Sequence, residues 1–287
     1  DLKQAVTAYA SSLNFGLESD PAAAGASELF CQAALCVGDL AEVVPEMVGP
    51  SFSDDASIRR LKSWLSNTNE DLRTAAARVL KLTVKFIPAE SMEQLVEYLL
   101  ERAVDDSASK QTAKHGSISA LGSIVIGTTA ESSCPRERIV KCILSTLKNE
   151  SKKSPMPVMI AACNAVGGMG KAGRLVEEES LNGVTALLQI TKTKSEEANK
   201  LIERAVVAVG NICETQKGKA REMAIEGLLK MHLIKYEEIQ FAVGETFARI
   251  GVADLAATDI ASDEVKKEGM ATMGQILQST LTELKDA

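Results

Sequence analysis

Apolar and small residues recur along the chain in a ten-residue pattern. Each copy begins with an apolar or small residue, has small residues near its fourth and fifth places, and is apolar at the ninth. Glycine often follows at the tenth place. The copies begin 38 to 45 residues apart, at Leu29, Leu72, Ala113, Val158, Leu201 and Ile239. This regular spacing indicates that one structural unit is repeated along the chain.

Each copy of the pattern is predicted to form the second helix of a helical hairpin. In the second copy, Leu72, Ala76 and Val79 fall on one face of a helix. Another amphipathic segment precedes each copy and supplies the first helix, with apolar residues such as Ile139, Val140, Ile143, Leu144 and Leu147. A period of about 40 to 47 residues is typical of HEAT and armadillo repeats. We therefore predict an all-α fold, an α-solenoid of about six HEAT/armadillo-like hairpins wound into a right-handed superhelix.

The array is expected to form a single domain over residues 1–287. Its repeats are predicted at residues 1–50, 51–88, 89–130, 131–175, 176–215 and 216–251. The pattern fades after Gly251, and residues 263–285 are expected to form one further helix with an apolar face. The chain begins at Asp1, without a methionine and inside a predicted helix, so we expect a segment of a longer polypeptide.

Local signals agree with these helices. Asn69 is predicted to cap the helix that follows it, and Ser91 with Gln94 reads as a capping box. Pro135 and Pro157 suit first turns, where the missing N–H costs little. Small residues are expected to let the helices lie close together, at Ala76, Gly116, Ala161, Ala162, Ala205 and Gly244.

Composition narrows the class of partner. The formal net charge is −7, so sequence-independent attraction to nucleic acid or to an anionic membrane is not expected. The longest apolar run, about residues 117–127, is too short to cross a bilayer about 30 Å thick. The cysteines form no CxxC pair and are interpreted as mostly buried thiols of an intracellular protein, at Cys31, Cys36, Cys134, Cys142, Cys163 and Cys213. We therefore expect a protein partner and no membrane-spanning segment.

One stretch resembles a phosphate-binding motif. Residues Gly168–Gly173 match the pattern GxGxxG. A dinucleotide site needs a strand entering the glycine turn and a helix leaving it. Here a predicted helix over residues 158–166 runs into the glycines, so a helix C-terminus followed by a turn explains the same residues. A nucleotide-binding enzyme that uses Gly168–Gly173 stays open as a remote alternative.

The remaining polar candidates are weak signals. His115 and His232 have no partner at a metal-ligand spacing and are expected to be structural or surface groups. The acidic run Glu177–Glu179 and the basic stretch Lys148–Lys153 are interpreted as solvated loops, with a partner-binding role as the alternative. Glu245 is predicted to be partly buried, with backbone N–H groups or an arginine of the next repeat as donors. We identify no catalytic, cofactor-binding or metal-binding residue, and the protein-binding residues stay unidentified.

Several short phrases stand in order along the chain: Arg73–Ala77, His115-Gly116 with Ala120–Gly122, Ala161–Gly167 with Gly170, Asn199-Lys200 with Glu203–Ala205, and Gln240-Phe241 with Gly244-Glu245. These phrases resemble successive repeats of the family of proteasome adapter and scaffold proteins. They occur in the family's order and at similar spacing over about residues 71–251. Ala113-Lys114 departs from the family pattern, because a bulkier residue and an arginine are expected there. Residues 1–50 resemble HEAT repeats only in general.

The resemblance implies a non-catalytic scaffold or adaptor, without a cofactor, that binds the regulatory and core particles of the 26S proteasome. It also implies that the protein links or stabilises these particles and takes part in proteasome quality control. A cytoplasmic and nuclear location and a peripheral association with endomembranes follow from the same resemblance. The alternative within the binding class is a HEAT-repeat adaptor for another complex, of the transport-receptor or phosphatase-scaffold type.

Overall fold

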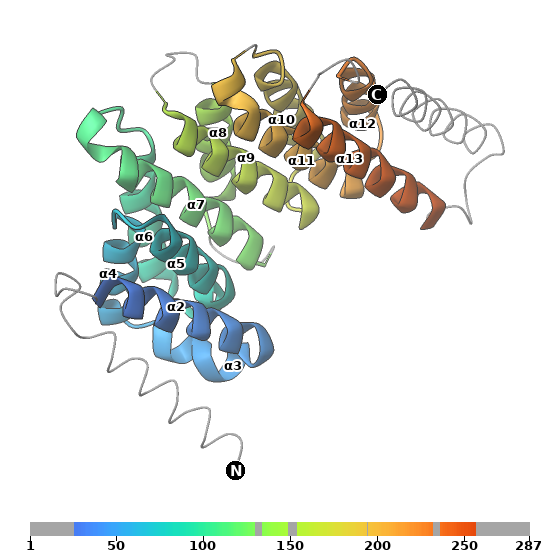
Figure 1. Cartoon of the computed structure of the whole chain (residues 1–287). Helices are drawn as coiled ribbons and strands as arrows, with labels where there is room; N and C mark the ends of the chain where they lie inside the picture. The colour runs from blue at the N-terminus through green and yellow to red at the C-terminus, as the bar shows by residue number, and fades with distance from the viewer. Residues whose placement is uncertain (1–25, 130–133, 149–153, 194, 232–235, 257–287) are drawn as a thin grey trace. The chain divides into compact units, whose positions relative to one another are not determined.

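The structure is a computed structural model that describes residues 26–129, 134–148, 154–193, 195–231 and 236–256 (Figure 1). Across these ranges the regular structure is entirely helical. Six helices carry the six copies of the repeated pattern: α2 (Ala26–Val43), α5 (Glu70–Thr83), α7 (Gln111–Gly127), α9 (Met156–Lys171), α11 (Asn199–Thr215) and α13 (Glu237–Ala256). The prediction that each copy forms a helix is confirmed.

Further helices lie between the pattern-bearing ones. They are α3 (Pro45–Val48), α4 (Asp55–Leu65), α6 (Ala89–Ala103), α8 (Arg136–Lys148), α10 (Glu177–Ile190) and α12 (Lys219–Leu229). Short 3₁₀ turns complete the connections, as η1 (Gly49–Phe52), η2 (Val84–Phe86), η3 (Ala108–Lys110) and η4 (Glu196–Ala198). This alternation of helices is the all-α repeat architecture expected from the sequence.

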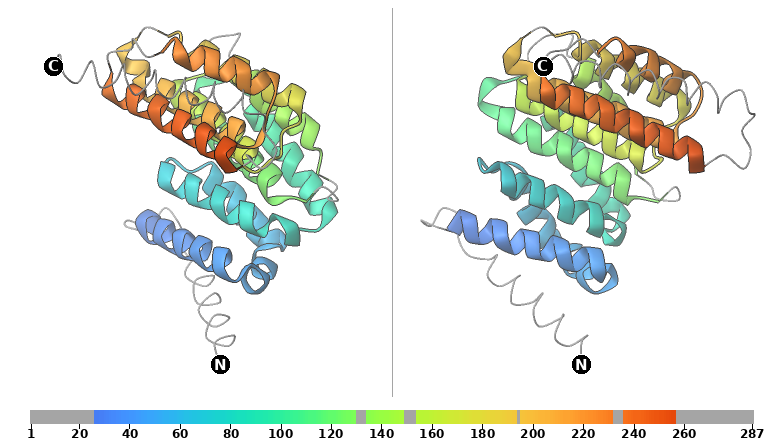
Figure 2. Two further views of the ribbon diagram at one scale, coloured as in Figure 1. Left: turned by 90° about the vertical axis from the view of Figure 1, so that its right-hand side faces the viewer. Right: turned by 45° about the vertical axis from the view of Figure 1, so that its right-hand side comes forward.

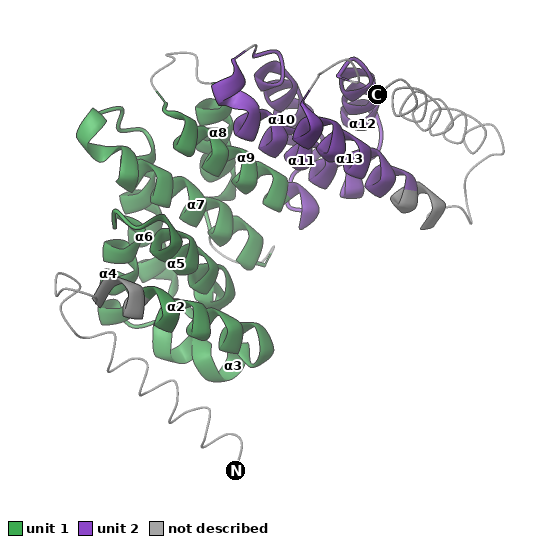
Figure 3. Cartoon of the chain, in the orientation of Figure 1, with its two compact units in different colours: residues 1–169 green, residues 170–287 purple. Residues whose placement is uncertain are grey.

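The chain divides into two compact units, residues 1–169 and residues 170–287, and the division falls within α9 (Figure 3). In the first unit, α5 packs between α2 and α7, and α6 packs against both α7 and α8 (Figure 2). In the second unit, α11 packs against α10, α12 and α13. The repeat boundaries and the right-handed superhelix stay predictions, and the expected helix at residues 263–285 lies outside the described residues.

Helix starts follow capping chemistry at several positions. The Asn69 side chain accepts hydrogen bonds from the backbone N–H groups of Asp71 at 2.9 Å and Leu72 at 3.4 Å, so the predicted cap is confirmed. The predicted capping box at Ser91 is wrong, because α6 begins earlier, at Ala89. The Ser91 hydroxyl lies instead 3.4 Å from Asp55 Oδ1.

The two prolines occupy the helix starts predicted for them. Pro157 is the second residue of α9, inside its first turn. Pro135 directly precedes α8, where its carbonyl accepts the N–H of Ile139 at 3.3 Å. Neither position requires the N–H that proline lacks.

Apolar residues of the pattern form the core between neighbouring helices. Leu72, Ala76, Val79 and Leu121 are completely shielded from solvent. Gly116 has no room for a side chain, because a Cβ there would fall on the backbone carbonyl of Leu65 at the end of α4. The prediction that Gly244 lets two helices lie close together is wrong, because Gly244 is exposed and a Cβ there would meet nothing within 4 Å.

Side-chain hydrogen bonds within each unit join residues about one repeat apart. In the first unit, Arg78 binds Glu42 at 2.7 Å and Arg138 binds Glu97 at 2.5 and 3.0 Å. In the second unit, such bonds join Thr215 to Gly170, Gln216 to Leu175, Tyr236 to Glu196 and Arg249 to Asn211. The partners in all six pairs are 36 to 45 residues apart. These bonds therefore link neighbouring hairpins at several places within each unit.

Candidate functional site

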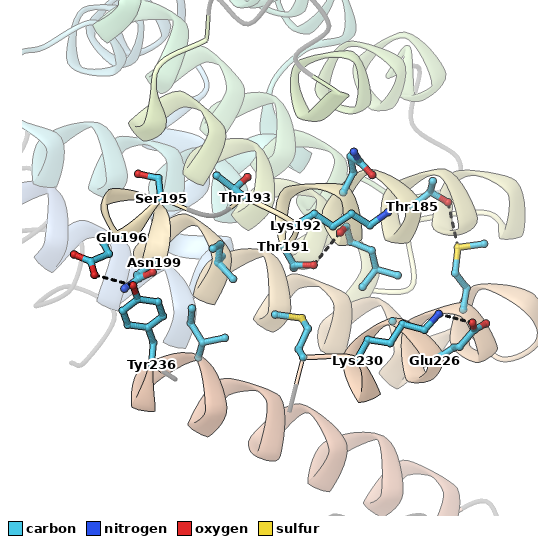
Figure 4. Close-up of a pocket in the computed structure, with 17 residues that line it drawn as sticks. Thr185, Thr191, Lys192, Thr193, Ser195, Glu196, Asn199, Glu226, Lys230 and Tyr236 are labelled. Atoms are coloured by element: carbon cyan, nitrogen blue, oxygen red, sulfur yellow. Dashed lines mark hydrogen bonds and ion pairs between the residues drawn. The ribbon is translucent and has the colours of Figure 1, made fainter. Parts of the chain in front are cut away.

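A cleft of about 930 Å³ opens in the second unit (Figure 4). Its walls come from α10, the turn that follows α10, η4, α12 and the first turns of α11 and α13. This volume lies within the range of about 300 to 1,000 Å³ that is usual for ligand-binding sites. We name it the α10–α12 cleft.

The floor of the α10–α12 cleft is apolar. It is lined by Leu188, Ile202, Met223, Met231 and Ile239. Ile202, Met231 and Ile239 are buried, whereas 37% of Met223 is exposed. Methionine side chains are flexible and polarisable, so a floor of this kind adapts to apolar side chains of different shape.

Close helix packing shapes the floor. A Cβ at Gly227 would lie 2.6 Å from Cδ1 of Leu188, so α12 lies close to α10 here and a larger residue would require the Leu188 side chain to move.

The rim of the cleft is polar and carries several hydroxyl groups (Figure 4). The Tyr236 hydroxyl donates to Glu196 Oε1 at 3.1 Å, and burial together with this carboxylate raises the pKa of Tyr236. At the other end, the Thr185 hydroxyl lies 3.3 Å from the sulfur of Met223. Lys230 and Glu226 form an exposed ion pair at 2.7 Å, four residues apart on the chain. An apolar floor with a hydroxyl-rich rim suits the binding of polypeptide side chains.

The glycines at residues 168–173 lie at the end of a helix, as the preferred interpretation of the sequence predicted. Helix α9 runs through Gly168 and Gly170 to Lys171. Gly173 has a φ of +65°, and its N–H donates to the Gly170 carbonyl at 2.8 Å. A Cβ at Gly170 would lie 2.6 Å from Cγ1 of Ile212, so this glycine serves contact with α11. The element that enters the turn is the helix α9 and not a strand, and α10 begins only at Glu177, after the glycines have ended.

His115 is a structural group, as expected. It is buried, and its Nδ1 accepts a hydrogen bond from Arg73 Nε at 3.1 Å. Arg73 is also buried, and its Nη1 donates to the carbonyls of Asn67 at 2.8 Å and Thr68 at 2.9 Å. Burial, and then the Arg73 charge, lower the pKa of His115. His232 lies outside the described residues.

Two interpretations of acidic residues are wrong. Glu245 is exposed, and its partner is Arg249 of the same helix, at 3.7 Å. The run Glu177–Glu179 is the first turn of α10 rather than a loop, and Glu179 accepts the N–H of Val176 at 3.0 Å. Carboxylates in a first turn face the positive end of the helix dipole, which explains their position. Of the stretch Lys148–Lys153, the structure describes only Lys148, at the end of α8.

The cysteines are free thiols. Cys31, Cys163 and Cys213 are buried and the other three are half-buried. Burial raises the pKa of Cys163 and of Cys213 to about 12, which leaves both thiols protonated and unreactive. Within the part of the chain that the structure describes, no group of three or more His, Cys, Asp and Glu residues could hold a metal ion.

Sequence reasoning identified no residue of the α10–α12 cleft. Its lining comes from four stretches of the chain, within residues 185–193, 195–202, 223–231 and 236–239, and most of these residues lie between copies of the repeated pattern. Gly227 was the available signal, as a glycine inside an apolar helix, but its role depends on Leu188 of another helix.

Comparisons with known proteins bear on the family. A family model described as ECM29, ARM-like repeats, matches residues 22–137. The human proteasome adapter and scaffold protein ECM29 is 25% identical to the chain over 248 residues, which is 78% of this chain and 13% of that protein. The chain thus spans a small part of its relative's length. These matches confirm the resemblance to proteasome adapter and scaffold proteins.

Solved structures of designed repeat proteins are also similar. One designed armadillo repeat protein is 19% identical, with a TM-score of 0.42, over 83% of this chain and 98% of the other. A second, in complex with a peptide, is 15% identical with a TM-score of 0.45, over 83% and 98%. Because these scores are low, the fold assignment rests on the helices described above. None of the described helices has the length and apolar character needed to cross a membrane.

Proposed function

We propose that this chain is a non-catalytic scaffold that binds the 26S proteasome, links or stabilises its particles and takes part in their quality control. The observation that carries the proposal is the similarity to the human proteasome adapter and scaffold protein over 78% of this chain. We propose a cytoplasmic and nuclear location for the chain, in keeping with this partner. We also propose that the predicted repeats form one continuous array.

The fold supports a binding role because its regular features are explained by packing. The repeated apolar positions fill the core, and Gly116, Gly170 and Gly227 allow close contacts between helices. A repeat array stacked in this way leaves long faces for partner proteins. We propose the α10–α12 cleft as a contact site, since it combines a partly open apolar floor with a polar rim.

Direct binding tests the proposal. The whole chain would be immobilised and exposed separately to purified 26S proteasome, core particle and regulatory particle, with bovine serum albumin as a negative control. We expect saturable binding of at least one particle. Absence of binding to all three would contradict the proposal for this chain. Recovery from a lysate of only transport cargo or only a phosphatase would favour the alternative adaptor class.

A further inference from the structure

A second cavity, of about 810 Å³, lies in the first unit between α6 and α8. We name it the α6–α8 cavity. Its lining is rich in charge and differs in this from the α10–α12 cleft. The charged lining residues are Glu97, Glu101, Asp106, Lys114, Arg138, Lys141 and Lys148.

Lys114 is the buried cation of this cavity. Only 5% of its side chain is exposed, and its Nζ lies 2.6 Å from Asp106 Oδ1. Lys114 occupies the second place of the repeated pattern, as Arg73 does one repeat earlier. Both side chains hold the connection that precedes their helix, but Arg73 has three acceptors. An ammonium group has three donors, so Lys114 retains donor capacity beyond its bond to Asp106.

The rim of the cavity adds two further cations. Lys141 and Lys148 are both exposed, and neither has an ionic or hydrogen-bonding partner in the described part of the chain. Arg138 does not contribute free charge, because its guanidinium binds both carboxylate oxygens of Glu97. Without the Arg138–Glu97 pair, the lining contains three lysines and two carboxylates, those of Asp106 and Glu101. The cavity therefore has an excess of one positive charge.

We propose that the α6–α8 cavity binds a carboxylate side chain on an acidic segment of another polypeptide. One carboxylate neutralises the excess charge, whereas a phosphate dianion would overcompensate it. The buried Lys114 ammonium can form a charge-assisted hydrogen bond to such a group, and this bond is stronger than one between neutral groups. The volume exceeds the space of one carboxylate, so neighbouring residues of the bound segment fit as well. This proposal is independent of the identity of the partner and so goes beyond the proposed function.

A labelled hexaglutamate peptide tests the proposal, with fluorescence anisotropy of the whole chain at low ionic strength. We expect binding that weakens as salt is added. Lys141→Gln and Lys148→Gln should each weaken it roughly twofold to fivefold, the effect of one exposed charge pair. Glu101→Gln should strengthen it by a similar factor. The matched control is Lys217→Gln, an exposed lysine of the second unit that lines neither the α6–α8 cavity nor the α10–α12 cleft, and it should leave binding unchanged.

Two results would overturn the proposal. The first is a peptide affinity that Lys141→Gln and Lys148→Gln leave unaltered, or that Lys217→Gln lowers equally. The second is displacement of the peptide by inorganic phosphate at concentrations where acetate of equal ionic strength has no effect, because the site would then prefer phosphate. Binding of hexaglutamate without binding of proteasome particles would contradict the proposed function alone.

Lys114→Gln supplies a second, internal test. We expect at least a fivefold loss of hexaglutamate affinity, because the buried ammonium is removed. Circular dichroism must show a helical content equal to that of the unaltered chain before the affinity is interpreted. Where that variant unfolds, Lys114→Arg replaces it and should retain binding to within about threefold. Retained affinity in a folded Lys114→Gln variant would contradict the role of Lys114.

Discussion

At the residue scale, one buried arginine holds a connection in place. Arg73 satisfies the carbonyls of Asn67 and Thr68 and the Nδ1 of His115, all from inside the core of the first unit. A buried guanidinium is costly unless its donors are used, and here they bind three acceptors. The hydrogen bonds of Arg73 thus offset the cost of burying its charge, and they fix the loop between α4 and α5.

Arg73→Met should destabilise the chain by about 2 to 4 kcal/mol. The methionine fills similar space but leaves the three acceptors without their donor, which carries a desolvation penalty. Urea unfolding measures the change. Arg59→Met is the matched control, since Arg59 is exposed and forms no hydrogen bond or ion pair that the described residues show, and it should change stability by less than about 0.5 kcal/mol.

We expect the free energy of unfolding to fall in mild acid because of His115. Its pKa is lowered in the folded state, so the unfolded chain takes up a proton at a pH where the folded chain does not. The contribution of neutral His115 to the free energy of unfolding is therefore complete above the pKa of about 6.5 that histidine has in the unfolded chain. This contribution declines as the pH falls below that value. Urea unfolding between pH 7.5 and 5.5 should show a falling free energy. His115→Gln should flatten this slope, and an unaltered slope would contradict the assignment.

At the element scale, glycines that look alike in the sequence have opposite roles. Gly116 in α7 meets the carbonyl of Leu65, whereas Gly244 in α13 faces open space. Both lie inside helices, Gly116 at the fourth place and Gly244 at the sixth place of a copy of the pattern. Which of them is required depends on the neighbouring helix and not on the local sequence.

The two glycine-to-alanine variants should therefore shift stability in opposite directions. Gly116→Ala should cost about 1 to 3 kcal/mol, because α7 must move away from the end of α4. Gly244→Ala should stabilise by about 0.5 to 1 kcal/mol, since alanine favours a helix and nothing obstructs its methyl group. Thermal or urea unfolding of both variants would check the signs. Equal effects would contradict the described packing.

Leu121 tests the apolar stripe of α7. Its side chain is fully buried, so Leu121→Ala should cost about 2 to 5 kcal/mol. Chemical denaturation would measure it. A loss below about 0.5 kcal/mol would place this residue outside the core.

Sequence reasoning predicted the elements better than the positions of single polar residues. The apolar spacing around Leu72 predicts a helix because a 3.6-residue period has few alternative explanations. Glu245 was misjudged because the same spacing does not say which helix face has a neighbour. The α10–α12 cleft was unpredictable for a related reason: Leu188, Met223 and Tyr236 are brought together only by the stacking of hairpins.

At the scale of the whole molecule, function depends on surfaces that several helices build together. Met223 contributes to the floor of the α10–α12 cleft and is 37% exposed there, so it is available to a partner. Its neighbour Glu222 is exposed on the same helix but does not line the cleft. This pair separates a contact in the cleft from a general effect on α12.

Met223→Asp should reduce binding to proteasome particles at least fivefold, because a charge on an apolar floor must be desolvated for contact. Glu222→Gln should bind as the unaltered chain does. Titration of immobilised chain with the particle that binds best would compare the three proteins. A similar affinity for all three would place the contact elsewhere on the chain.

The bonds that join hairpins one repeat apart also have a mechanical consequence. Arg78 with Glu42, and Arg249 with Asn211, each secure one neighbour and nothing farther away. Tension on the chain would then load successive hairpins in series, and each junction would yield by itself. A chain of this kind, attached to a partner at each end, would lengthen in small steps as single hairpins yield. Single-molecule pulling would record these steps as a sawtooth of modest forces.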